Sequence, residues 1–104
     1  QDLYSKIIRP ENYYESLKLA KEVQGSLLGS LRSKYSKVNN IGVKEGPFFV
    51  LINAPGPAIL VEVSFISHPE EEKRLRNEDY QEAIAEGILR GIKKYIEEMK
   101  VAAT

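Results

Sequence analysis

The sequence feature that most constrains the fold is the apolar run within residues 57–69, PAILVEVSFISHP. Pro57 opens the run, four apolar residues follow, and a single carboxylate, that of Glu62, interrupts it. A continuous apolar run bounded by turn residues is typical of a β-strand buried on both faces. Such a strand needs neighbours in a sheet, so this run dictates what the rest of the chain has to supply.

Glu62 has two interpretations at this point. A charge in a buried strand is costly unless it is paired, bound to a metal or used in a reaction. In the first interpretation it is a structural carboxylate at the end of a strand, reaching water or a basic partner. In the second it is a catalytic carboxylate at the carboxyl edge of a sheet, where open α/β sheets bind their ligands. The pattern alone leaves both open.

The remaining chain predicts helices with period near 3.6 on either side of two strands. A link of five residues, 53–57, joins the strands, which suits an antiparallel connection better than a parallel crossover. In chain order we expect a lead-in arm (1–12), a helix (13–35), a strand (48–52), a strand (58–64), a short helix (69–76), a final helix (77–100) and a tail (101–104).

Both long helices carry start signals. Asn12 followed by Glu15 three residues later predicts a capping box for the first helix, and Asn77 predicts a cap for the last. The apolar stripe of the last helix is expected to face the core. Its members are Tyr80, Ile84, Ile88, Ile92, Tyr95, Ile96 and Met99.

Each long helix also contains two glycines spaced four residues apart, Gly25 with Gly29 and Gly87 with Gly91. A glycine in a helix interior costs about 1 kcal/mol relative to alanine. The spacing indicates either close packing against a neighbour or an accident of sequence. For Gly87 and Gly91 the expected neighbour is the sheet.

Composition bounds the function classes. The 104 residues suit one small domain, and 15 basic residues balance 15 acidic ones, so no overall field draws the chain to nucleic acid or an anionic membrane. There is no cysteine, which excludes disulfides and thiolate metal sites. No apolar run is long enough to span a bilayer. The chain starts at Gln1, and we expect no signal peptide within it.

Two strands cannot easily bury both faces of a fully apolar strand, because isolated two-stranded units are marginal. We therefore expect either more sheet outside these residues or assembly of the chain into oligomers.

Five parts of the sequence form a recognisable pattern. In order they are SLKLA at 16–20, GVK at 42–44, FVL at 49–51, PAILVEVSFIS at 57–67, and Tyr80-Gln81 with Ile84-Ala85. Together they resemble the C-terminal half of the zinc-dependent N-acetylmuramoyl-L-alanine amidases, the amidase 3 family of bacterial cell-wall hydrolases. The resemblance covers nearly the whole chain from about Glu11 onward.

The resemblance implies an α/β fold around a mixed, mainly parallel sheet with helices on its faces. It also implies that residues 13–100 are the C-terminal half of a catalytic domain that acts on peptidoglycan. The protein would then lie in the cell envelope, as a periplasmic or secreted protein. The family cleaves the amide between the lactyl group of N-acetylmuramic acid and L-alanine, with a zinc-activated water and a carboxylate base that corresponds to Glu62.

The family's zinc ligands, two histidines and a glutamate, lie in the N-terminal half, so the resemblance places them outside this chain. The sole histidine, His68, stands where relatives commonly have Asn in a Ser-Asn-Pro helix cap, and Ser64 replaces a usual Gly. A zinc site needs about three protein ligands, and one histidine without cysteine does not supply it. We therefore expect these residues to be inactive alone. The alternative is a non-enzymatic α/β interaction module that pairs through a sheet edge.

Overall fold

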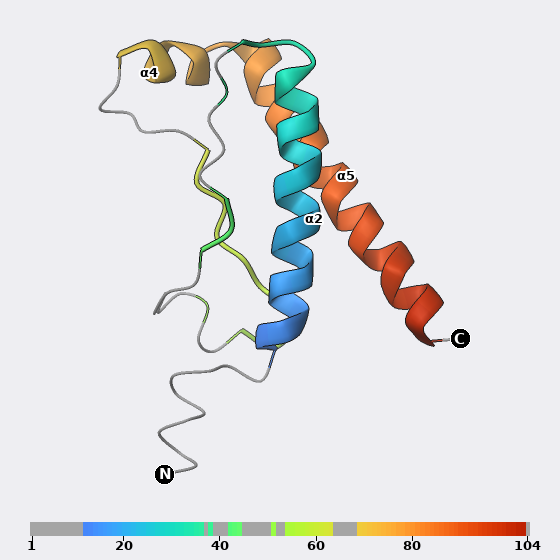
Figure 1. Cartoon of the computed structure of the whole chain (residues 1–104). Coiled ribbons are helices and arrows are strands. Elements are labelled where there is room, and N and C mark those ends of the chain that lie inside the picture. Colours follow the sequence, from blue (N-terminus) through green and yellow to red (C-terminus); the bar gives the residue numbers. More distant parts are fainter. Residues whose placement is uncertain are drawn as a thin grey trace.

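The computed structural model describes residues 12–36, 38, 42–44, 51, 54–63 and 69–103. Three helices account for most of them: α2 (Tyr13–Arg32), α4 (Pro69–Leu75) and α5 (Glu78–Ala103). Figure 1 shows α2 and α5 side by side and running in opposite directions, with α4 beside the start of α5. No helix in this part of the chain is both long and apolar enough to cross a bilayer.

The core lies between α2 and α5 near the C-terminal end of α2. Its buried members are Leu27 and Leu31 from α2 and Tyr80 and Ala83 from α5. The hydroxyl of Ser30, also buried, donates a 2.7 Å hydrogen bond to the carbonyl of Ala83. A buried polar group that finds such a partner avoids the cost of lost hydration, so this bond holds the two helices in one register.

Close approach of the helix pair depends on Gly87 and Gly91. A Cβ added at Gly87 would lie 2.7 Å from the Cα of Leu27, and one at Gly91 would lie 2.8 Å from the backbone nitrogen of Val23. The expected close contact at these glycines is therefore with α2 and not with a sheet. Nothing lies within 4 Å of a Cβ added at Gly25 or Gly29, so their spacing carries no packing role here.

The expected caps have different outcomes. The Asn77 carboxamide accepts from the backbone N–H groups of Asp79 (2.8 Å) and Tyr80 (3.2 Å), which confirms its role at the start of α5. The predicted capping box at Asn12 is not formed, because the Asn12 side chain makes no cap hydrogen bond. The carboxylate of Glu15 reaches α5 and Lys18 instead.

The stripe expected on α5 is confirmed in part: Tyr80 and Tyr95 are buried, and Ile84 and Ile88 pack against the core. Tyr80, Ala83, Gly87, Gly91 and Tyr95 are buried, whereas three of the predicted stripe residues are more than a third exposed. The small residues at the contact let α2 approach along the glycine ridge, and this leaves the other three stripe residues at the margin of the contact. Those exposed residues are Ile92, Ile96 and Met99.

The predicted α/β sheet is wrong for the described residues, none of which is in a β-strand. Residues 57–63 run without regular secondary structure beside α2 (Figure 1), and Leu60 is 51% exposed. Of the strand expected at 48–52 only Leu51 is described, and it is helical. Val61 and Val63 pack against the core between the helices, which needs no strand neighbour, so the described residues contain no sheet edge of the kind that the interaction-module alternative requires.

Candidate catalytic segment

Glu62 lies in the segment 57–63, where burial alternates along the chain. Ile59, Val61 and Val63 are half-buried, while Leu60 and Glu62 are exposed. This alternation is that of an extended backbone, in which successive side chains point to opposite sides. One side of the segment therefore faces the helices, and Glu62 projects from the other.

Two kinds of contact hold the segment against the helix pair. At its start the backbone N–H of Ala58 donates a 2.9 Å hydrogen bond to Oγ of Ser16, near the beginning of α2. Further on, Val61 and Val63 pack against the core cluster that contains Leu27 of α2.

The spacing of these contacts shows how the segment runs. From Ser16 to Leu27 the helix rises about 16 Å at 1.5 Å per residue. From Ala58 to Val63 an extended chain also covers about 16 Å at 3.3 Å per residue. An extended segment of this length therefore reaches from Ser16 to the core cluster, and Figure 1 shows that it runs beside α2 in the same direction.

The carboxylate of Glu62 is available for chemistry. Its side chain is exposed, and neither ion pair of the described residues, Lys18 with Glu15 and Arg76 with Glu72, involves it. Exposure to solvent agrees with the structural interpretation as well as with the catalytic one. A free carboxylate on an anchored extended segment is able to accept and return a proton.

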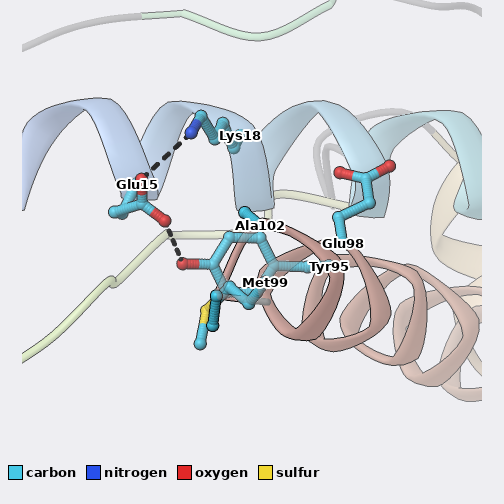
Figure 2. A pocket seen from close by; sticks show the side chains of 7 residues that line it. Glu15, Lys18, Tyr95, Glu98, Met99 and Ala102 are labelled. Carbon is cyan, nitrogen blue, oxygen red and sulfur yellow. Dashed lines mark hydrogen bonds and ion pairs between the residues drawn. The ribbon is translucent and has the colours of Figure 1, made fainter.

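A second polar group, which the sequence did not predict, joins the other end of the helix pair. The phenol of Tyr95 donates a 2.8 Å hydrogen bond to the Glu15 carboxylate, which also binds the Lys18 ammonium at 3.2 Å. Figure 2 shows these side chains with Glu98 around a shallow pocket between α2 and α5.

The ionisation of this group follows from its contacts. The hydrogen bond from Tyr95, and then the contacts with Lys18, lower the pKa of Glu15. Burial, and then the bond to Glu15, raise the pKa of Tyr95. A hydrogen bond with Glu22 raises the pKa of Glu98, because two carboxylates that close together share a proton. The group links the two helices through the Tyr95–Glu15 hydrogen bond, beside the Lys18–Glu15 ion pair within α2.

The described residues do not form a metal site. They contain no group of three or more histidine, cysteine, aspartate or glutamate side chains placed to hold an ion. His68 and Ser64 lie outside the described residues. Since a protein zinc site takes about three such ligands, the donors seen here do not fit zinc.

Comparison with known proteins decides the family. The family model described as N-acetylmuramoyl-L-alanine amidase matches residues 4–94. The chain belongs to this amidase family. The match includes α2, the segment with Glu62, α4 and most of α5, and it confirms the resemblance found in the sequence.

Among curated amidase-family relatives, the N-acetylmuramoyl-L-alanine amidase AmiC of Escherichia coli O6:H1 is 41% identical over 81 residues, which cover 78% of this chain and 18% of AmiC. The germination-specific N-acetylmuramoyl-L-alanine amidase of Bacillus subtilis is 33% identical over 87 residues, covering 83% of this chain and 35% of the relative. The uncharacterized protein YqiI of Bacillus subtilis is 32% identical over 83 residues, covering 80% and 38%. The chain thus spans less than two fifths of the length of each. No solved structure matches it significantly.

Sequence reasoning missed the two residues that organise these contacts, Ser16 and Glu15. Ser16 lies within the SLKLA segment that carries part of the family resemblance, yet a serine in the first turns of a helix is ordinary. Glu15 was assigned to a cap. The partners of both are distant in sequence, 42 residues away for Ser16 and 80 for Glu15, so no local pattern indicates them.

Proposed function

We propose that this chain is part of a peptidoglycan amidase that hydrolyses the bond between the lactyl group of N-acetylmuramic acid and L-alanine, and that Glu62 is its catalytic carboxylate. The observation that carries the proposal is the family match together with a free, exposed Glu62 on a segment anchored at both ends. Because peptidoglycan is its substrate, the protein acts in the cell envelope, on the periplasmic or outer side.

The role of Glu62 follows from the chemistry of amide hydrolysis. A water molecule attacks the carbonyl carbon, and the Glu62 carboxylate accepts the proton that this water loses. The same carboxyl group then donates the proton to the amide nitrogen, so that the nitrogen leaves as the free amine of L-alanine. Deleting a general acid–base group of this kind slows a reaction about 10²- to 10⁴-fold.

Zinc belongs to the proposal only as a family property. The described residues do not fit a zinc site, so its ligands are expected outside this chain, in an N-terminal half of the domain that would be its direct partner. We expect these 104 residues alone neither to retain zinc nor to cleave peptidoglycan.

The test compares this chain with a protein extended upstream to the length of its relatives. Release of stem peptides from purified peptidoglycan and zinc content are measured for the wild type, Glu62→Gln and Glu70→Gln. Glu70 is the matched control, since it is an exposed glutamate on α4. We expect Glu62→Gln to lose activity about 10²- to 10⁴-fold with zinc retained, and Glu70→Gln to stay active. An active Glu62→Gln enzyme would show that the assignment is wrong.

A further inference from the structure

The hydrogen bond between Ser16 and Ala58 has a consequence for the placement of Glu62. Ser16 is half-buried in the second turn of α2, and its hydroxyl oxygen accepts the Ala58 N–H at 2.9 Å. We propose that Ser16 is a positioning residue that fixes the register of residues 57–63 along α2 and thereby sets where Glu62 lies. This inference rests on the proposed function for its catalytic meaning, although the register itself is independent of it.

The apolar contacts alone do not define this register. Ile59, Val61 and Val63 alternate with exposed residues, so a slip by two residues puts aliphatic side chains into two of these positions and another apolar residue, Phe65 or Pro57, into the third. A slip of one residue is disfavoured, because it would turn the Glu62 carboxylate toward the apolar core. A slip of two would move Glu62 by about 6.6 Å and put Leu60 or Ser64 in its place.

The registers differ in which residue lies opposite the hydroxyl of Ser16. In one slipped register Leu60 would replace Ala58 and bring a larger side chain to a half-buried position against α2. In the other Gly56 would replace it, which requires opening the bend at Pro55 and Gly56. Leu60 and Gly56 also carry a backbone N–H, so the hydrogen bond to Ser16 forms with good geometry only where the residue opposite the hydroxyl is small and the bend stays closed, which is the register with Ala58.

The first test uses the 104-residue chain and nuclear magnetic resonance. We expect Ser16→Ala to speed amide exchange at Ala58 about 10-fold and to transfer part of the contacts that Val61 makes with the core cluster to Ile59. Ser16→Thr keeps a hydroxyl and is expected to restore the wild-type pattern. Unchanged Ala58 exchange and unchanged Val61 contacts in Ser16→Ala would overturn the proposal.

The second test measures peptidoglycan cleavage by the upstream-extended protein. Ser16→Ala is expected to lower kcat about 10- to 100-fold, since small misplacements of a catalytic group have effects of that size, and Ser16→Thr is expected to recover it. Ser30→Ala is the matched control on α2: it removes a buried hydrogen bond to Ala83 and lowers the melting temperature, yet leaves kcat unchanged.

The outcomes separate the two proposals. If Glu62→Gln abolishes cleavage while Ser16→Ala has wild-type kcat, the positioning role fails and the catalytic assignment stands. If Glu62→Gln remains active, the catalytic assignment fails, and the exchange and contact measurements on the short chain still decide whether Ser16 sets the register.

Discussion

Replacing Gly91 by alanine tests the central packing feature, the contact between α5 and the backbone of α2. A Cβ at this position would lie 2.8 Å from the Val23 nitrogen and 2.9 Å from the Glu22 carbonyl oxygen. These atoms belong to the helix backbone, so no side-chain rotation relieves the contact. The helices must separate by several tenths of an ångström or more to reach ordinary distances of about 3.5 Å.

The magnitude follows from two opposing effects. Overpacking of this kind costs about 2 to 3 kcal/mol. Alanine gains about 1 kcal/mol over glycine in helix propensity. Gly91→Ala should therefore lower the free energy of unfolding by about 1 to 2 kcal/mol, which for a domain of this size lowers the melting temperature by about 4 to 16 °C.

Gly25→Ala is the matched control, because nothing lies within 4 Å of a Cβ added there. It keeps the propensity gain without the overpacking, so its melting temperature should rise by about 4 to 8 °C. Thermal unfolding followed by circular dichroism, in one buffer and at one protein concentration, measures both. If the two alanine variants are stabilised alike, the helices do not meet at Gly91 and the packing argument is refuted.

Two further predictions concern the polar group between α2 and α5. Tyr95→Phe removes the hydrogen bond that most lowers the pKa of Glu15, so a side-chain titration should show that pKa rising. Because the pKa of Glu15 is lower in the folded than in the unfolded state, its ionised carboxylate stabilises the fold at pH values above the unfolded-state pKa, and this stabilisation is lost as pH falls through the folded-state pKa. The variant should therefore melt at a lower temperature than the wild type at neutral pH, and the two melting temperatures should converge in acid. The pH dependence at Glu98 has the opposite sign, since its hydrogen bond with Glu22 raises its pKa. Its contribution to the stability of the fold is present below the ordinary carboxyl pKa and is lost as pH rises through the raised pKa. Glu98→Gln should therefore melt higher than the wild type at neutral pH and equally in acid, and a constant difference at all pH values would contradict the shared proton.

The sequence predicted the elements that depend on neighbours within a few residues. The period of apolar residues located α2 and α5, and the Asn77 side chain caps the start of α5 as expected. Helix hydrogen bonds and caps close over three or four residues, so the local pattern carries the information. The motif around Glu62 indicated the family, which the family model confirms.

What surrounds Glu62 and which face α5 buries were decided only by the tertiary structure. An apolar run requires burial but does not specify whether sheet neighbours or helices provide it, and here Val61 and Val63 pack on the helix pair. The stripe of large residues predicted the inward position of Tyr80 and Tyr95, but the backbone contact at Gly87 and Gly91 left Ile92, Ile96 and Met99 exposed. The contacts of Ser16 with Ala58 and of Glu15 with Tyr95 join residues 42 and 80 positions apart, and such pairs exist only once the chain has folded.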